Sequence, residues 1–267
     1  MVNRSTYYKH CNSGQSRRAI ENADISQKIT AIYFAYNKCL GAYKINHILE
    51  REYGIRISLG RVYRLMRKLH LPKVMKQRRP RIKYVKNNGN MTNYLKQEFY
   101  PKNPNKVWCS DFTYIKVGGH FYYLCVVMDL FSRKIISWHL SNKHNEDLVI
   151  DTLKKAIKCR RINNGLMFHS DRGAEYTSVN FRRLLDSMNI VQSFSKKGYP
   201  YDNACMESFF KYLKQERTNR SVYHTQEELY LDVFDYIESF YNDKRPHGTL
   251  GNCTPNEYEG EYYKKAG

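Results

Sequence analysis

The sequence has no long apolar run and no apolar leader. No stretch of its 267 residues approaches the roughly 18 consecutive apolar residues that a membrane-spanning helix needs. Residues 1–10 lack the apolar segment of a secretory signal peptide. We therefore expect a cytoplasmic protein that is neither secreted nor embedded in a membrane.

Cysteine is present, but not in pairs. The seven cysteines form no CxxC motif, and their number is odd. This pattern argues against a disulfide framework and against a structural zinc site. We expect reduced thiols in a cytosolic protein. With 42% hydrophobic and 26% charged residues, the composition indicates a globular chain of one or two domains, long enough to bury a core.

Acidic residues are scarce in the first part of the chain. Residues 1–110 carry 23 Lys or Arg and 5 Asp or Glu, whereas residues 111–267 carry 22 and 20. Most of the net charge of +20 therefore belongs to the N-terminal region. A basic region attached to a nearly neutral body predicts a polyanionic partner that docks on that region, rather than a merely basic surface.

A helical hairpin is expected in this basic region. Apolar periodicity predicts helices over 24–39, 43–53 and 58–70. Gly54 suits the C-terminal cap of the second helix, and Ser58 suits the N-terminal cap of the third. The third helix carries four basic residues: Arg61, Arg64, Arg67 and Lys68. The pattern is typical of a helix-turn-helix whose second helix lies in the DNA major groove; a three-helix bundle with a basic face is the alternative.

A basic connector follows the helices. Positions 61–86 hold eleven basic residues and no acidic one, and Pro72 and Pro80 favour an extended backbone. Extended basic segments contact phosphates without reading the sequence, and Arg78, Arg79 and Arg81 are the expected contacts. We therefore expect three regions. They are a helical DNA-binding region over 1–72, a basic linker over 73–104 and a catalytic domain with a helical tail over 105–267.

The residue pattern changes near residue 105. Strands are expected over 107–117, 122–128 and 134–139, with Gly118-Gly119 as the first turn. The segments expected after them are a helix over 145–159, a strand over 166–168, a helix over 179–188, a strand over 190–193, a helix that begins with Asp202 as its cap, and a helix over 227–241. Three meandering strands followed by alternating helices and strands is the order of a ribonuclease-H-like α/β domain.

Three carboxylates occupy unusual positions in that order. Asp111 interrupts an apolar strand, where a charged side chain is costly without a partner or a metal. Asp171 directly follows a short strand, at the edge where α/β sheets bind ligands. Glu207 lies on a helix and shares one edge of it with Lys211 and Lys214.

Such a set suits phosphoryl transfer. Two hard cations about 4 Å apart can bind the attacking and leaving oxygens of a phosphodiester, and Mg²⁺ prefers oxygen ligands. We expect Asp111, Asp171 and Glu207 to hold two Mg²⁺ ions, for which Mn²⁺ can substitute. Lys211 or Lys214 would contact the DNA backbone beside them. Taken singly, each acid would be a solvated surface residue, so the hypothesis depends on all three falling at the right elements of one fold.

Other residues near these acids admit plainer interpretations. We interpret His169 as a structural or supporting histidine rather than a metal ligand. A catalytic triad around Ser170 is rejected, because adjacent residues of one strand face opposite sides. Arg245 and His247 either contact DNA or belong to the turn at which Pro246 ends a helix.

Several segments resemble one known family. Asp171 and Glu207 are separated by 35 residues, the spacing of retroviral integrases and of the bacterial DDE transposases. The segments WCSDFTYI at 108–115, HSDRG at 169–173 and YDNACMES at 201–208 closely resemble OrfB-type transposases of the IS-three insertion-sequence family. So do Lys214, the N-terminal RVYRLM at 61–66 and the tail over 242–258. The resemblance covers nearly the whole chain.

The resemblance implies an enzyme that cleaves the ends of an insertion sequence and joins their 3′-hydroxyls to DNA. It implies terminal inverted repeats and target DNA as partners, a homodimer or higher oligomer, and a nucleoid-associated location in a bacterium. Family members are usually fused to an upstream OrfA product. Because no heptad repeat is visible, we expect the upstream part to be absent, so that this chain is either the OrfB product alone or an element read without its partner. Two alternatives are a nuclease of the same fold and a DNA-binding repressor with a degenerate core, against which the three carboxylates argue.

Overall fold

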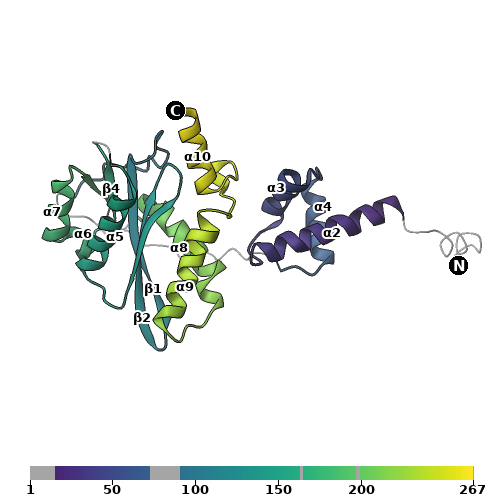
Figure 1. Cartoon of the computed structure of the whole chain (residues 1–267), viewed down its shortest axis with the longest axis horizontal. Helices are drawn as coiled ribbons and strands as arrows, with labels where there is room; N and C mark the ends of the chain where they lie inside the picture. Colours follow the sequence, from purple (N-terminus) through teal and green to yellow (C-terminus); the bar gives the residue numbers. More distant parts are fainter. Residues whose placement is uncertain (1–15, 73–90, 163–164, 197–198, 267) are drawn as a thin grey trace, which may run out of the picture. The chain divides into compact units, whose positions relative to one another are not determined.

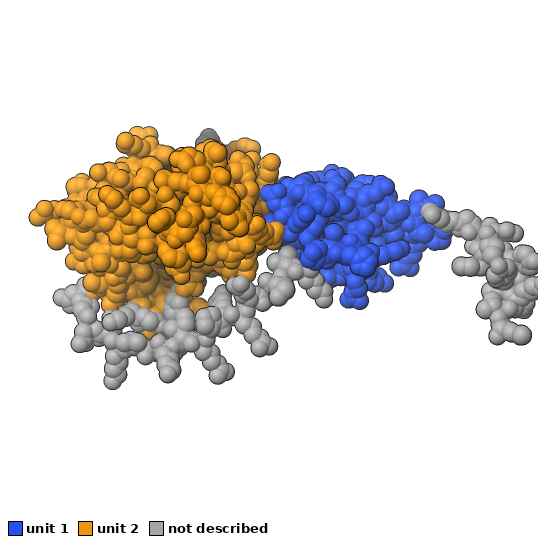
Figure 2. All heavy atoms as spheres, turned by 90° about the horizontal axis from the view of Figure 1, so that it is seen from below, with its two compact units in different colours: residues 1–78 blue, residues 79–267 orange. Residues whose placement is uncertain are grey.

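The computed structural model describes residues 16–72, 91–162, 165–196 and 199–266, in two compact units over 1–78 and 79–267 (Figures 1 and 2). The predicted DNA contacts Arg78, Arg79 and Arg81 lie outside the described residues. Across these described ranges, every helix is too short or too polar to cross a membrane.

The first unit is the predicted group of three helices. Their bounds are α2 (Arg17–Ala35), α3 (Ala42–Tyr53) and α4 (Leu59–Lys68). Helix α2 begins earlier than predicted, because the Ser16 hydroxyl accepts a hydrogen bond from the Ala19 N–H. Gly54 ends α3 with a φ of +65°, and the Ser58 hydroxyl caps α4 by accepting from the Arg61 N–H, both as expected. Apolar side chains of all three helices form one buried core.

The second unit is built on a five-stranded sheet. Its strands are β1 (Val107–Val117), β2 (His120–Asp129), β3 (Ile135–Ser141), β4 (Met167–Ser170) and β5 (Val191–Phe194). They lie in the order β3-β2-β1-β4-β5; β1, β2 and β3 are antiparallel, and β4 and β5 run parallel to β1. Gly118 and Gly119 make the first turn with positive φ. This is the predicted ribonuclease-H-like order.

Helices cover both faces of the sheet (Figure 1). One face packs against α5 (Glu146–Cys159), α6 (Ala174–Thr177) and α7 (Val179–Ser187), which enclose the main core. The other face carries α8 (Ala204–Glu216), α9 (Gln226–Phe234) and α10 (Pro255–Ala266). The expected helix over 227–241 is instead α9 followed by a π-helix over Asp235–Tyr241.

Asp202 does not cap α8, contrary to expectation. The residue before α8 is Asn203, and Asp202 lies in a short 3₁₀ turn, Pro200–Asn203. The buried carboxylate of Asp202 accepts hydrogen bonds from the side-chain amides of Asn93 and Gln97 and from the Lys196 N–H. Asp202 therefore joins the 3₁₀ turn before α8 to the segment that holds Asn93 and Gln97.

Residues 91–104, which the sequence analysis included in the linker, pack on the sheet. The Thr92 carbonyl accepts from the Phe194 N–H, and the Ser193 hydroxyl accepts from the N–H groups of Tyr94 and Leu95. Leu95 is buried. This part of the predicted linker thus covers the β5 edge of the sheet.

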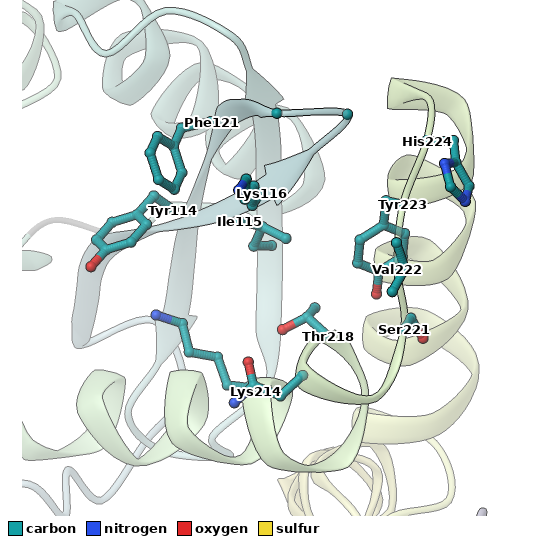
Figure 3. Close-up of a pocket in the computed structure, with 13 residues that line it drawn as sticks. Tyr114, Ile115, Lys116, Phe121, Lys214, Thr218, Ser221, Val222, Tyr223 and His224 are labelled. Atoms are coloured by element: carbon teal, nitrogen blue, oxygen red, sulfur yellow. The ribbon is translucent and has the colours of Figure 1, made fainter.

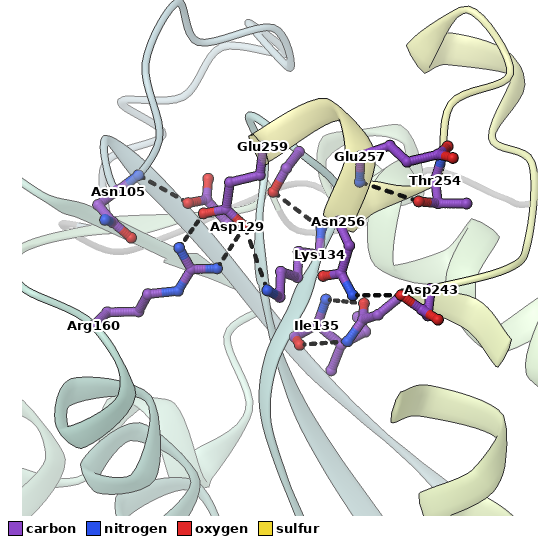
Figure 4. Close-up of polar contacts among 12 residues, drawn as sticks. Asn105, Asp129, Lys134, Ile135, Arg160, Asp243, Thr254, Asn256, Glu257 and Glu259 are labelled. Carbon is purple, nitrogen blue, oxygen red and sulfur yellow. Dashed lines mark hydrogen bonds and ion pairs between the residues drawn. The ribbon is translucent and has the colours of Figure 1, made fainter. Parts of the chain in front are cut away.

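The C-terminal tail is tied to the sheet by buried polar contacts. Asn242 bonds both the N–H and the carbonyl of Ile135 through its side-chain amide. Glu259 of α10 pairs with Arg160 at the end of α5 and lies 3.6 Å from the Lys134 ammonium (Figure 4).

A second buried contact involves Arg245. Its guanidinium donates two hydrogen bonds of 2.8 Å to Glu216, whose carboxylate also accepts from the Tyr236 hydroxyl. Arg245 is only 3% exposed. The alternative in which Arg245 contacts DNA is therefore wrong, and the residue belongs to the core of the tail.

Candidate active site

The register of two parallel strands places two of the predicted carboxylates together. Strands β1 and β4 are paired, with Cys109 opposite His169. Asp111 lies two residues further along β1, and Asp171 directly follows the end of β4. Because side chains alternate along a strand, Asp111 stands on the face that Cys109 occupies.

Both carboxylates are held by backbone groups. Asp111 accepts from the Phe112 N–H at 2.8 Å, and Asp171 accepts from the Gly173 N–H at 2.9 Å. In the described residues neither carboxylate forms an ion pair. Their negative charge is therefore not neutralised by a nearby Lys or Arg contact.

Burial raises the pKa of Asp111 to about 7, because it penalises the charged carboxylate. Burial is the largest cause, followed by the negative charge of Asp171, and the charge of Glu207 adds to it. The Phe112 N–H and the Lys214 ammonium oppose the rise. The charges of Asp171 and Glu207 therefore both act on the Asp111 carboxyl.

Glu207 reaches this site from the first turn of α8. Its side chain is exposed, whereas the predicted core residues of the helix, Met206, Phe209, Phe210 and Leu213, are buried. The Asn203 amide donates to the Ser110 carbonyl and so ties the start of α8 to β1. The helix thereby holds Glu207 above the strand that carries Asp111.

The donor chemistry of the site fits a hard divalent cation. The predicted ligands are carboxylate oxygens only, and their mutual repulsion is what a bound cation relieves. Within the described ranges, no three His, Cys, Asp or Glu side chains are already arranged as a ligand cluster. Of the three predicted ligands, the exposed Glu207 is the one whose side chain is not enclosed by the core.

Two residues near Asp171, His144 and Glu175, were not predicted from the sequence. His144 lies 3.2 Å from the Glu175 carboxylate, and its ring packs against those of Phe112 and Tyr123. Burial and the charge of Glu175 raise the pKa of Asp171, while the Gly173 N–H and His144 lower it. Glu175 could have been noticed four residues after Asp171, but nothing in the sequence marks His144.

Gly173 lies close to both of these carboxylates. A Cβ atom at position 173 would lie 2.7 Å from a Glu175 carboxylate oxygen and 3.1 Å from Oδ1 of Asp171. A larger residue here would displace the Glu175 side chain.

His169 is structural, in agreement with its interpretation from sequence. Its ring nitrogens lie 2.9 Å and 3.1 Å from the hydroxyls of Ser193 and Ser195 on the β5 side. Burial lowers the pKa of His169 to about 4, so the ring is neutral near pH 7. Ser170 donates to the Asp171 carbonyl instead of to His169, and no triad forms.

The Lys and Arg residues that are predicted to contact DNA differ in exposure and in ion pairing. On α4, Arg64, Arg67 and Lys68 are exposed, whereas Arg61 pairs with Glu21 at 2.9 Å and donates to Asn22. On α8, Lys211 and Lys214 are partly buried, and the Lys214 ammonium lies 5.0 Å from the Tyr114 ring centroid. Arg61 therefore presents less free charge to DNA than its neighbours.

Family comparisons agree with both units. A family model described as an integrase core domain matches residues 101–200, and a second with the same description matches residues 207–262. A family model described as an HTH-like domain matches residues 19–81.

The similar proteins of known sequence come from insertion sequences. The chain is 36% identical to the transposase for insertion sequence element IS904 of Lactococcus lactis, over 91% of this chain and 96% of that protein. It is 31% identical to the uncharacterized 31 kDa protein of insertion element IS600 of Shigella sonnei, over 99% and 97%. It is 38% identical to the transposase InsF for IS3A of Escherichia coli, over 63% and 59%.

Solved structures with similar folds are retroviral integrases. The catalytic core of BIV integrase matches with a TM-score of 0.46 and 18% identity, over 61% of this chain and 99% of that one. The HTLV-2 integrase catalytic core in complex with magnesium matches with a TM-score of 0.44 and 19% identity, over 59% and 98%.

Proposed function

Because this chain belongs to the IS-three (IS3) family of insertion-sequence transposases, enzymes with a DDE integrase core, we propose that it cleaves the ends of its element and joins their 3′-hydroxyls to DNA by two-metal phosphoryl transfer. One observation supports the chemistry most directly. Asp171 and Glu207 both raise the pKa of Asp111, as expected of carboxylates gathered for cations.

In this proposal Asp111, Asp171 and Glu207 hold two Mg²⁺ ions, or Mn²⁺ in their place. When bound, the cations make water or a DNA 3′-hydroxyl a better nucleophile and stabilise the leaving oxygen. The parallel pair β1 and β4 orients the two aspartates, and the exposed Glu207 completes the set from α8. Lys211 and Lys214 contact the phosphates of the strand that is cut.

We assign DNA docking to the basic helical region over 1–72. Arg64, Arg67 and Lys68 are its main contacts, and Arg61 is a weaker one because Glu21 already pairs with it. The linker, with Arg78, Arg79 and Arg81, adds salt-dependent affinity for phosphates. Residues 91–104 belong with the catalytic region over 105–267, since they pack on β5.

The expected partners follow from the reaction. The enzyme binds the terminal inverted repeats of its element and a target DNA, and bringing two ends together requires at least a homodimer. An OrfA product would be fused to this chain or act with it. We place the protein in the bacterial cytoplasm, on the nucleoid.

Mg²⁺-dependent cleavage of the flanking inverted repeats tests this function, with and without OrfA. Glu207→Gln should abolish cleavage and leave DNA affinity within a few-fold. Glu227→Gln is a matched control, because Glu227 is also an exposed first-turn glutamate, on α9. Equal cleavage by wild type and Glu207→Gln would refute the site.

A strand-transfer assay with a pre-cut end separates the transposase from a nuclease of the same fold. The proposed enzyme joins the pre-cut 3′-hydroxyl to a second DNA. Cleavage without joining, also in the presence of OrfA, would favour the nuclease.

A further inference from the structure

A cavity of about 520 Å³ opens at the edge of β1, next to Lys214 of α8. One wall is the β1–β2 hairpin, and the other is the segment over 218–224 that follows α8 (Figure 3). Strand β4 pairs with β1 only up to Cys109. The segment over 218–224 pairs with β1 through a bridge between Tyr223 and Val117. The edge of β1 between these points borders the cavity.

Two aromatic rings stand uncovered at this cavity. Tyr114 is 60% exposed and Phe121 is 50% exposed, and their rings pack edge to face with centroids 5.4 Å apart. Their neighbours on the same face of the hairpin, Phe112 and Tyr123, are instead covered by the His144 ring. Two large rings left in water beside Lys214 indicate a surface that a ligand covers.

The cavity is cationic at its rim. The Lys214 ammonium points toward Tyr114, 5.0 Å from its ring centroid, and Lys116 also lines the cavity (Figure 3). Thr218 and Ser221 offer hydroxyls on the opposite wall. None of the lining side chains in the described part of the chain is acidic. Aromatic faces, ammonium groups and neutral hydrogen-bonding groups together match a nucleotide.

We propose that this cavity binds an unpaired base of the DNA strand that runs through the active site, with the base stacked on Tyr114 and Phe121 and its phosphate at Lys214. The proposal rests on the proposed function, which brings DNA to Asp111. Tyr114 follows Asp111 by three residues of strand, about 10 Å or a few nucleotide steps, and its side chain stands on the opposite face of β1, so the DNA strand reaches it around the edge of β1 that borders the cavity. A base held here keeps the end of the duplex open beside the scissile bond.

The test compares two DNA probes on the full-length protein without divalent cations. One probe is a short duplex with a single-stranded extension, and the other is the blunt duplex of the same sequence. Wild type should prefer the extended probe in competition anisotropy. Tyr114→Ala and Phe121→Ala should each reduce this preference about tenfold, because stacking of one base is worth about 1–3 kcal/mol. Tyr114→Phe, which keeps the ring, should retain it.

A second exposed pair of rings provides the control. Tyr263 is 50% exposed and packs edge to face on Tyr262 at 5.5 Å, nearly the geometry of Tyr114 and Phe121. Tyr263→Ala should leave the preference unchanged. Thermal unfolding midpoints close to wild type would show that each variant is folded.

A photo-crosslink locates the base directly. 5-Iododeoxyuridine in the extension should crosslink to the peptide that holds Tyr114 or Phe121. An unchanged preference in folded Tyr114→Ala and Phe121→Ala would overturn the proposal. An equal loss of affinity for both probes would also overturn the proposal, and so would a crosslink confined to other peptides. In that case the edge of β1 would remain as a binding site for an extended peptide.

These outcomes are separable from the proposed function. If the extended probe is preferred through Tyr114 but wild type neither cleaves nor joins DNA with Mg²⁺, the base site stands and the transposase chemistry fails. If wild type cleaves and joins but shows no preference, the base site fails alone.

Discussion

The two units of this protein place their functional charges in opposite surroundings. On α4, Arg64, Arg67 and Lys68 are exposed, opposite a buried apolar stripe. In the catalytic unit, Asp111 lies on β1 and Asp171 directly after β4, and burial raises the pKa of each. The difference follows from the partner: exposed cations attract a polyanion through water, whereas carboxylates that concentrate cations act best where water is excluded.

The two arrangements differ in their effect on the free energy of folding. An exposed arginine adds little to the free energy of folding in either direction, while two buried carboxylates that repel each other destabilise the metal-free fold. We therefore expect mutations of the site carboxylates to separate stability from activity, and mutations of the exposed residues Arg64, Arg67 and Lys68 to change DNA affinity alone.

The largest expected effect is that of Asp111→Asn. Cleavage should fall by roughly 1000-fold or more, about 4 kcal/mol of barrier, because a cation ligand is lost. Single-turnover cleavage measures this loss. At about pH 8 in the presence of a chelator, the variant should nevertheless unfold at a higher temperature than wild type, since asparagine removes the repelling charge and still accepts from Phe112.

The pH dependence of the stability gain is the control for Asp111→Asn. The gain in stability should shrink as the pH is lowered from about 8 to about 5, because the pKa of Asp111 is about 7 and the wild-type carboxyl then becomes neutral. A lower unfolding temperature for the variant at both pH values would contradict the comparison.

Arg245→Ala should have the next largest effect, on stability. It leaves the buried Glu216 carboxylate without its partner, which typically costs about 3–5 kcal/mol. Chemical denaturation measures the loss, and Arg220→Ala, at an exposed position, is the control. If Arg245→Ala kept its stability and lost DNA affinity, Arg245 would be a DNA contact after all.

The pH dependence of stability should reveal Asp129. Burial raises the pKa of this fully buried carboxyl to about 6, against the hydrogen bonds that it accepts from the Asn105 and Phe131 N–H groups. A raised pKa favours the protonated form in the folded state. The stability that this group contributes at low pH is therefore lost as the pH rises through about 6.

Denaturation between about pH 4.5 and pH 7 tests this sign. Asp129 should lower the wild-type free energy of unfolding by about 2 kcal/mol over that range. Asp129→Asn should flatten the pH profile by that amount. Parallel profiles for the two proteins would show that Asp129 ionises normally.

The smallest expected effect distinguishes two arginines of α4. Arg64→Ala should weaken DNA binding and reduce the slope of log affinity against log salt by about 0.9, the value for one phosphate contact. Arg61→Ala should change the slope less, because Glu21 already neutralises Arg61, and should reduce stability more. A larger change of slope for Arg61→Ala than for Arg64→Ala would show that Arg61 separates from Glu21 when DNA binds.

Local rules of sequence explain much of the fold. Gly54 and Ser58 cap α3 and α4 as expected, because a cap depends only on residues within one turn. The hairpin turn at Gly118-Gly119 and the buried stripe of α8 follow for the same reason. The spacing of the carboxylates pointed to the family, although the roles of individual residues stay predictions.

Features that depend on distant partners escaped prediction. Asp202 resembled a helix cap, yet its carboxylate bonds to Asn93 and Gln97, more than a hundred residues earlier. The segment over 91–104 resembled a linker because its contacts with β5 involve single backbone groups and one hydroxyl. His144 could not be found, since only the fold brings it to Glu175.

By itself, the amino-acid order determined the kinds of elements, their succession and the three acids worth testing, because periodicity and caps act over a few residues. Tertiary structure alone decided that the charges of Asp171 and Glu207 act on the buried Asp111, whose pKa is about 7. It also decided that the helix layer ends before Tyr114 and Phe121 and leaves both rings in water. Strand register and helix packing join residues far apart in the chain, so no local pattern encodes them.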